Sequence, residues 1–142
     1  MYQFIQGELK AIDIPIHRMK YEAFGVPDDI TKVMGWSDNI DGSKKVKITV
    51  DFISQGQKEQ ISFEASSIEP LLNSIERQKD LSLVIESGCR SGQCALCRTK
   101  MVSGKIFVPP EVTIREIDRN YGFIHPCISY PLTDVYLDLT LT

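Results

Sequence analysis

The sequence predicts an α+β domain over residues 45–142, and three patterns carry this prediction. Apolar residues alternate with polar ones over 46–52 and again at 61–63, as in strands with one buried face. Over 68–75 the apolar residues recur at the three- and four-residue spacing of an amphipathic helix. Alternation returns over 135–141. Strands at both ends of a segment, with a helix between them, are typical of an α+β fold.

The first half of this domain is expected to contain a hairpin and then the helix. Gln55-Gly56 stands between the first two alternating runs and offers the turn of a hairpin. Ser66-x-x-Glu69 has the form of a capping box, which predicts the start of the helix.

The second half is expected to hold a loop, a second hairpin, a short helix and a closing strand. The loop runs over 86–97. Ser103-Gly104 separates the runs 98–102 and 105–108 and predicts the second hairpin. Thr113-x-x-Glu116 offers a cap for the short helix, and the alternation over 135–141 predicts the strand.

Residues 1–36 form a separate unit in this interpretation, joined to the domain by a polar, turn-prone linker at 37–44. Apolar residues at helical spacing predict a helix that ends at Ile14-Pro15, and 19–24 alternates like a short strand. A single helix and strand cannot close a core of their own. We therefore expect residues 1–25 to pack against the domain or against a second copy of the chain, since a strand with open edges attracts pairing.

Composition excludes several classes of function. The 142 residues are 42% hydrophobic with a formal charge of −3, and they contain no run of Lys or Arg, so nucleic acid is not an expected partner. No apolar stretch approaches 18 residues, so no membrane span is expected. The sequence shows no secretory signal, and the expected compartment is the reducing cytoplasm.

The four cysteines of the chain have an informative spacing, Cys89-x4-Cys94-x2-Cys97 and then Cys127. In a reducing compartment, grouped cysteines more often hold metal than form disulfides. Three thiolates from one loop and a distant fourth match the ligand spacing of plant-type [2Fe–2S] centres. A structural zinc site with four thiolates is the alternative, but such sites usually draw their ligands as two pairs.

The motifs around these cysteines resemble the plant-type [2Fe–2S] ferredoxin domain, which has a β-grasp fold with a mixed sheet and a packed helix. The resemblance rests on Gly-Cys-Arg-Ser-Gly-Gln-Cys-Ala-Leu-Cys-Arg at 88–98, Val-Ser-Gly-Lys at 102–105 and Cys-Ile-Ser-Tyr-Pro at 127–131. It covers residues 45–142 and is closer to the ferredoxin domains fused to flavin reductases that serve oxygenases. Segments within 1–36, such as Tyr-Glu-Ala-Phe-Gly at 21–25, look like the end of a ferredoxin–NADP⁺-reductase-like nucleotide domain.

The resemblance implies one-electron transfer at low potential, about −400 mV for plant-type ferredoxins. It implies that Cys89 and Cys94 hold the iron nearer the surface, and Cys97 and Cys127 the inner iron. A flavin reductase domain is the implied electron donor and an oxygenase or another redox protein the implied acceptor. FAD and NAD(P)H are implied only for domains upstream of this chain.

An anionic cluster needs positive or polar compensation from the loop that holds it. Gly88 and Gly92 allow the unusual backbone angles by which a tight loop aims successive N–H groups at sulfur. Arg90 and Arg98 add positive charge if their side chains fold back, or are simply solvated. Pro126 departs from the family pattern, and because proline lacks an N–H, one donor near Cys127 is absent.

Other chemistry-bearing residues have plainer interpretations. His125 invites comparison with Rieske centres, but four cysteines complete the ligand set, so we expect a packing or surface role. Trp36 is expected to pack the two units together. Asp118, Asp134 and Asp138 could help to dock a partner, although an ordinary solvated surface is the expected role.

Two further functions stand beside electron transfer. The chain could be part of an NAD(P)H-dependent flavin oxidoreductase whose catalysis lies in upstream domains, because the sequence contains no Gly-x-Gly-x-x-Gly phosphate loop of its own. A zinc-stapled interaction module is the third interpretation.

Overall fold

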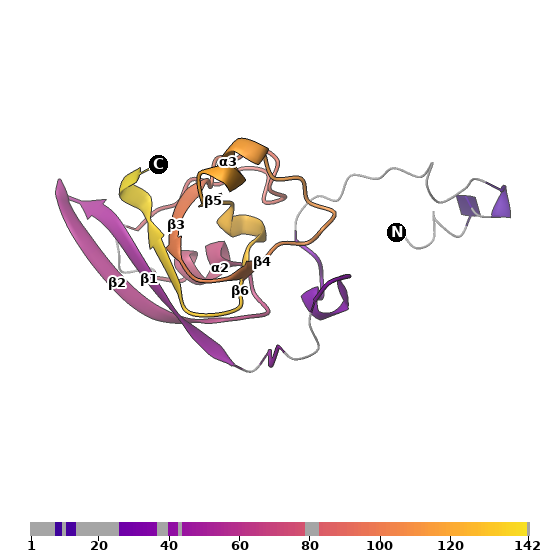
Figure 1. Ribbon diagram of the computed structural model, residues 1–142, viewed down its shortest axis with the longest axis horizontal. Coiled ribbons are helices and arrows are strands. Elements are labelled where there is room, and N and C mark those ends of the chain that lie inside the picture. Colours follow the sequence, from indigo (N-terminus) through magenta and orange to yellow (C-terminus); the bar gives the residue numbers. More distant parts are fainter. Residues whose placement is uncertain are drawn as a thin grey trace.

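A five-stranded mixed sheet forms the centre of the computed structural model, which describes residues 8–9, 11–13, 26–36, 40–42, 44–78 and 83–141 (Figure 1). The strand order is β2-β1-β7-β3-β5; β1 and β7 run parallel, and all other neighbours run antiparallel. The strands are β1 Lys45–Ser54, β2 Gln57–Ser66, β3 Thr99–Ser103, β5 Phe123–Ile124 and β7 Val135–Asp138. The α+β prediction is confirmed.

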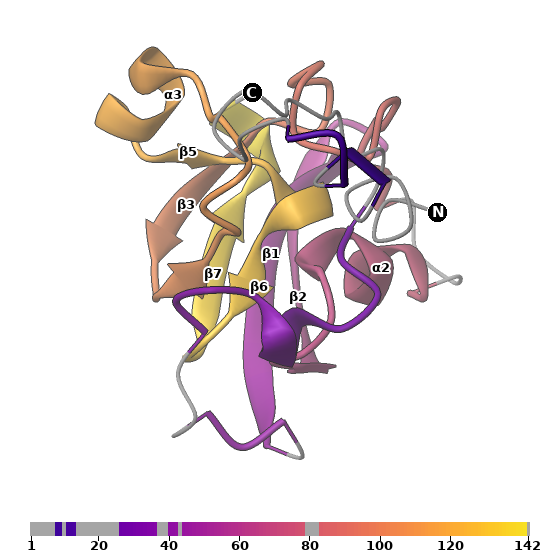
Figure 2. The same cartoon turned by 90° about the vertical axis from the view of Figure 1, so that its right-hand side faces the viewer.

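The chain also forms a second, two-stranded sheet and several short helices (Figure 2). None of the helices in the described part of the chain is long and apolar enough to cross a membrane. The small sheet pairs β4 Ile106–Phe107 with β6 Tyr130–Pro131. The helices are η2 Ile30–Lys32, α2 Leu71–Glu76, α3 Glu116–Asn120, η3 Pro126–Ile128 and η4 Leu139–Leu141.

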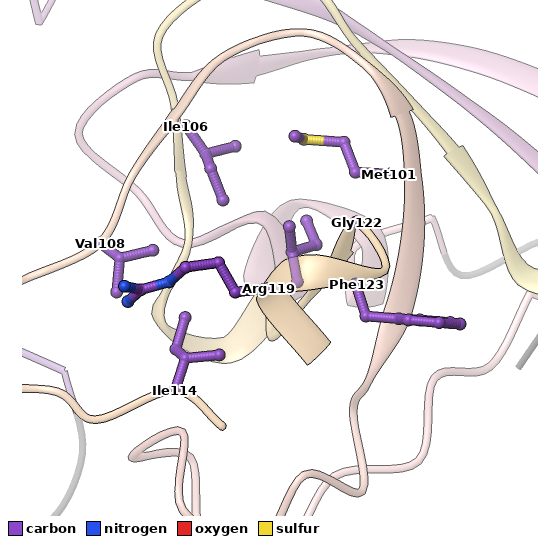
Figure 3. A pocket seen from close by; sticks show the side chains of 8 residues that line it. Met101, Ile106, Val108, Ile114, Arg119, Gly122 and Phe123 are labelled. Carbon is purple, nitrogen blue, oxygen red and sulfur yellow. The ribbon is translucent and has the colours of Figure 1, made fainter. Parts of the chain in front are cut away.

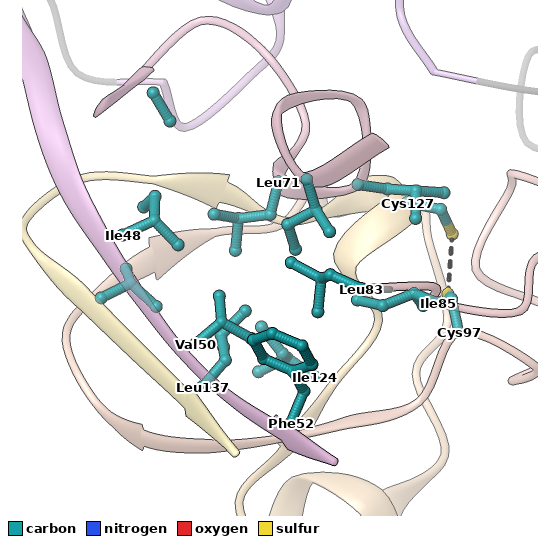
Figure 4. Close-up of a cluster of buried hydrophobic side chains, with 14 of the residues drawn as sticks. Ile48, Val50, Phe52, Leu71, Leu83, Ile85, Cys97, Ile124, Cys127 and Leu137 are labelled. Carbon is teal, nitrogen blue, oxygen red and sulfur yellow. Dashed lines mark hydrogen bonds between the residues drawn. The ribbon is translucent and has the colours of Figure 1, made fainter. Parts of the chain in front are cut away.

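The hydrophobic core lies between one face of β1 and helix α2 (Figure 4). Alternate residues of β1, from Val46 to Phe52, are buried, and they meet Leu71, Leu72 and Ile75 of α2. Each large apolar side chain buried in this way contributes roughly 1.5–3 kcal/mol. Cys97 and Cys127 belong to the same buried cluster, so the core extends to the cysteine loop.

The opening hairpin is confirmed. Ser54 pairs with Gln57, which leaves a two-residue turn, and Gln55 and Gly56 both have positive φ, 51° and 81°. Positive φ at both central residues is the mark of the type I′ turn that matches strand twist.

The predicted capping box does not form. Helix α2 begins after Pro70, because the residue before a proline is disfavoured in the helical region. The Ser66 hydroxyl instead accepts from the Ile68 N–H at 3.4 Å, and the Glu69 carboxylate pairs with Arg77 near the end of the helix. The apolar spacing was therefore informative, but it placed the helix start too early.

The predicted second hairpin is wrong, although both strands exist. β3 pairs with β7 and β5, whereas β4 pairs with β6 in the other sheet. Gly104 between them has φ 113°, and a Cβ there would lie 2.6 Å from the Asp134 carbonyl oxygen. This close backbone approach, which only glycine permits, lies where the chain passes from one sheet to the other.

The last two predicted elements are present with different ends. Helix α3 forms, but its N-cap is Arg115 without a side-chain bond, so the predicted cap at Thr113 is wrong. Strand β7 ends at Asp138, whose carboxylate accepts from the N–H and hydroxyl of Thr140 at 2.8 and 2.6 Å. This local turn converts the rest of the predicted strand into η4.

Residues 30–36 pack on the small sheet. Trp36, Ile30 and Tyr130 form a second buried cluster, in which the Trp36 and Phe107 rings meet edge to face at 5.2 Å. The helix and strand expected within 1–25 lie mostly outside the described residues, as do parts of the linker at 37–44. The division into 1–36, 37–44 and 45–142 therefore stays a prediction.

Asp51 is buried on β1, on the face away from the apolar core. Its carboxylate accepts hydrogen bonds from Gln60 and from the Tyr136 hydroxyl, each at 2.7 Å, and pairs with Lys58 at 2.7 Å. These contacts, Lys58 first, lower the pKa of Asp51 to about 2, so the carboxylate is ionised at neutral pH. The three contacts tie β1, β2 and β7 together.

We expect Tyr136→Phe to lower the free energy of unfolding by about 1–2 kcal/mol, because it removes one hydrogen bond to a buried carboxylate. Urea titration of tryptophan fluorescence under reducing conditions measures this change. Tyr121→Phe is the matched control, since Tyr121 is 65% exposed. Equal stability of the Tyr136 variant and the wild type would contradict the role given to Asp51.

Candidate metal centre

The loop over 88–97 has an unusual backbone. Arg90, Gly92 and Ala95 all adopt positive φ, at 50°, 79° and 57°. For a residue other than glycine this conformation costs roughly 1–2 kcal/mol, and such strain concentrates at functional sites. A Cβ on Gly92 would lie 2.8 Å from Val112 Cγ1 and 2.9 Å from Ile128 Cγ1, so the loop is packed tightly at this point.

The four cysteines, all free thiols, lie in an outer and an inner pair. Cys94 is exposed and Cys89 is half-buried, whereas Cys97 and Cys127 are only 2% and 3% exposed. The two inner sulfur atoms are 3.3 Å apart, at the edge of the core (Figure 4). Cys97 comes from the loop, and Cys127 lies in η3, which Pro126 begins. The order of exposure is the one that the resemblance implies.

Backbone N–H groups point at the outer sulfur of Cys89. Those of Ser91 and Cys94 lie 3.4 and 3.3 Å from it. Burial raises the pKa of this thiol, but the Ser91 hydroxyl and these N–H groups lower the pKa to about 6. The Ser91 hydroxyl is itself buried without a hydrogen-bond partner, so it acts on Cys89 as a nearby dipole and not as an aligned donor.

The two inner sulfur atoms shift each other's pKa in opposite directions. The contact with Cys127 lowers the pKa of Cys97 to about 6, and the same contact is the main cause that raises the pKa of Cys127. Two thiolates at this distance repel each other unless a cation lies beside them. A metal ion bound by both sulfur atoms would supply this charge, because a coordinating thiol is deprotonated.

The donor set fits a binuclear cluster. Within the described ranges, no three His, Cys, Asp or Glu side chains gather around one point as ligands of a single ion. Two buried sulfur atoms in contact, two outer cysteines on the same loop, N–H groups aimed at the Cys89 sulfur and an orphaned hydroxyl at Ser91 suit an anionic cluster held by thiolates.

The other predicted site residues surround the thiols in different ways. The unusual backbone angle expected at Gly88 is not found, since of the two loop glycines only Gly92 has positive φ. A Cβ on Gly88 would lie 2.9 Å from Cδ1 of the exposed Leu96 side chain and 3.6 Å from the Cys94 sulfur. Arg90 pairs with Glu76 at 2.6 Å. Arg98 lies 3.5 Å from Asp118 and 4.1 Å above the Phe123 ring. Both guanidinium groups thus pair with carboxylates.

Sequence reasoning missed a buried polar pair next to the loop. His125 is fully buried; its Nδ1 lies 2.8 Å from the Gly92 carbonyl oxygen and its Nε2 lies 3.1 Å from Asp118 Oδ2. The solvated role expected for Asp118 and Asp138 is wrong, since they are 1% and 8% exposed. The available signal was the spacing of Arg115 and Asp118, which pair across one turn at the start of α3.

Two of the open cavities in the described part of the domain are lined in part by residues of β3. One, of about 320 Å³, is lined mainly by apolar residues such as Met101, Ile106 and Phe123, with Arg119 as its charged member and no cysteine (Figure 3). The other, of about 420 Å³, is lined in part by Leu96 and Arg98 and adjoins the cysteine loop.

Comparison with known proteins gives a consistent result. The family model described as "2Fe-2S iron-sulfur cluster binding domain" matches residues 53–132, more than half of the chain, including all four cysteines. The chain is similar to one subunit of the 1,2-phenylacetyl-CoA epoxidase from Escherichia coli, with 26% identity over 92% of this chain and 34% of that protein. It is also similar to vegetative ferredoxin from Trichormus variabilis, with 37% identity over 40% of this chain and 56% of that protein.

A solved structure supports the fold. The ferredoxin reductase of carbazole 1,9a-dioxygenase superposes with a TM-score of 0.53 and 18% identity, over 67% of this chain and 29% of that one. The fold is therefore the β-grasp fold of [2Fe–2S] ferredoxins. The chain corresponds to about a third of the first curated relative and about half of the second.

In protein freed of metal, we expect alkylation of Cys89 by iodoacetamide to rise with pH about a midpoint near 6, because the thiolate forms above that pKa and the unreactive thiol below it. Cys127, whose pKa is raised, stays unlabelled at pH 7. Peptide mass spectrometry measures both sites. In urea, all four cysteines serve as the control, with midpoints at about 8.5. A folded-state midpoint for Cys89 equal to that in urea would contradict the arrangement of donors around it.

Proposed function

The chain belongs to the family of 2Fe-2S iron–sulfur cluster binding domains, and from this premise we propose that Cys89, Cys94, Cys97 and Cys127 hold its [2Fe–2S] cluster. The protein is an electron-transfer domain of the ferredoxin type. The observation that supports this ligand set most strongly is the donation of two backbone N–H groups to the Cys89 sulfur, beside a buried pair of sulfur atoms 3.3 Å apart.

A [2Fe–2S] cluster supplies reversible one-electron chemistry, at a potential set by hydrogen bonds to sulfur and by exposure. The chain supports this chemistry because one side of the site is buried in the core and the other side is exposed to solvent. The core around Cys97 and Cys127 excludes water from the inner side. On the outer side, exposed Cys94 and half-buried Cys89 bring the site to the surface, where a partner can approach.

The electron donor proposed for this domain is a flavin reductase domain, and the acceptor is an oxygenase or another redox protein. Support comes from the epoxidase relative, whose match runs over 92% of this chain yet covers only 34% of its own length. Residues 1–36 are then the end of a nucleotide-binding domain, followed by the linker 37–44 and the ferredoxin domain 45–142. FAD and NAD(P)H belong to the upstream domains, and the compartment is the cytoplasm. Residues 1–25 pair with the domain or with another copy.

We expect the purified chain to be red-brown and to contain about two irons and two sulfides, as the proposed cluster requires. Reduction by dithionite bleaches the colour and gives a rhombic electron paramagnetic resonance (EPR) signal. Cys97→Ala abolishes the signal, because an iron with an open position is labile. Ser103→Ala, at the exposed end of β3, is the control and keeps full iron content. Stoichiometric zinc without iron after anaerobic expression would contradict the proposal.

We also expect no oxidation of NADH or NADPH by the chain alone with cytochrome c as acceptor, because a two-electron donor needs a flavin to deliver electrons singly. Addition of a flavin reductase that accepts NAD(P)H gives turnover that depends on this chain. Spectrophotometry at the nicotinamide and cytochrome absorbance bands measures both. Turnover without the added flavoprotein would show that the chain carries its own hydride-accepting site.

A further inference from the structure

His125 joins the two segments that carry the cysteines. Its main chain stands at the N-cap of η3, immediately before the turn with Cys127. The His125 carbonyl accepts from the Ile128 N–H at 3.0 Å and from the Ser129 hydroxyl at 2.8 Å. The residue is therefore fixed to the Cys127 segment, while its ring reaches Gly92 in the loop that carries the other three cysteines.

The ring is held on its far side as well. Asp118 Oδ2 accepts from His125 Nε2 at 3.1 Å and from Arg115 Nε at 2.7 Å, and Arg98 lies 3.5 Å from Oδ1. Burial raises the pKa of Asp118, but the hydrogen bonds from Arg115 and His125 lower the pKa by more than burial raises it. The pKa is therefore below its ordinary value, and the group is a carboxylate. A carboxylate that holds the second nitrogen of a histidine fixes the orientation of the ring.

The contact with Gly92 decides which end of a peptide group faces the ring. The Gly92 carbonyl oxygen and the Asp118 carboxylate can both only accept, so both ring nitrogens carry a hydrogen, Nδ1 for the 2.8 Å bond to Gly92 and Nε2 for the bond to Asp118. In a trans peptide, the N–H of the next residue points the opposite way, so the amide of Gln93 is directed away from His125. Anionic sulfur is stabilised by N–H groups and destabilised by carbonyl oxygens nearby.

Gly92 needs directional contacts to fix its peptide groups. Its φ of 79° and the absence of a Cβ make it a permissive backbone position. Val112 and Ile128 restrict it by packing, which is non-directional. The Gly92 N–H forms a hydrogen bond with the Cys127 sulfur, and the bond to His125 adds a directional constraint on the carbonyl side.

We propose that His125 is a positioning residue of the iron–sulfur site, which locks the Gly92 carbonyl so that the cysteine loop and the Cys127 segment keep one mutual register. This inference rests on the proposed ligand set. His125 binds no iron itself; it acts through Gly92, and Asp118 holds it in place.

The test compares three substitutions of His125 in the reconstituted protein. His125→Ala removes both contacts, and we expect iron to be lost to a chelator such as bathophenanthroline at least about tenfold faster, the usual scale for loss of an outer hydrogen bond at a metal site. His125→Asn keeps an amide where Nδ1 stands, whereas His125→Gln keeps one where Nε2 stands. The Asn variant therefore retains the Gly92 contact and restores slow iron loss, and the Gln variant does not.

Two readouts separate positioning from general stability. The EPR spectrum of the reduced protein shifts in the Ala and Gln variants and returns toward that of the wild type in the Asn variant. In cluster-free protein, the rate of hydrogen exchange at the Gln93 amide differs from that of the wild type in the Ala and Gln variants and returns toward it in the Asn variant. Tyr136→Phe is the matched control, because it also removes one hydrogen bond to a buried carboxylate but leaves both cysteine segments untouched.

Equal rates of iron loss and equal spectra in the wild type and in all three His125 variants would overturn the proposal, and so would equal acceleration in Tyr136→Phe. Rescue by Gln instead of Asn would also overturn it, because the Asp118 contact would then be the one that matters. Failure of the proposed function looks different: the wild-type chain itself would bind no iron.

Discussion

The direction of peptide groups in one tight loop is the constraint on which the rest of the site depends. Anionic sulfur needs N–H groups around it, and successive N–H groups can face one point only if the backbone visits the left-handed region. Arg90 and Ala95 accept this conformation at an energetic cost, and Gly92 accepts it freely. The neighbouring elements hold the loop in this shape: Glu76 at the end of α2 binds Arg90, and Val112 and Ile128 enclose Gly92.

The inner half of the site is continuous with the hydrophobic core. Cys97 and Cys127 pack in the same cluster as Leu71 of α2 and Ile48 of β1 (Figure 4). Their contact lowers the pKa of Cys97 and raises that of Cys127, so the proposed cluster would place positive charge where two thiolates alone would repel each other. With the proposed ligand set, metal binding and folding would be coupled, since the energy of binding is available only to the folded arrangement.

Local patterns predicted the elements, and contacts distant in sequence decided their partners. The hairpin turn at Gln55-Gly56 and the cysteine spacing were readable, because each depends on a few adjacent residues. The pairing partner of β4 could not be read from the sequence, since it depends on the close approach of Gly104 to Asp134. The start of α2 was also misplaced, because Pro70 precedes the helix. The burial of Asp118 was missed, because charged residues are mostly exposed, its partner His125 lies on another element, and its spacing to Arg115 was the one local signal that we named.

The position of β7 has a consequence for biosynthesis. It is the last strand of the described chain, yet it lies between β1 and β3 and joins the two halves of the sheet. During translation all four cysteines leave the ribosome before Val135. The loop and η3 are therefore synthesised before β7, the strand that completes the sheet beside them. The four thiols are therefore present in the nascent chain before the strand that completes their support.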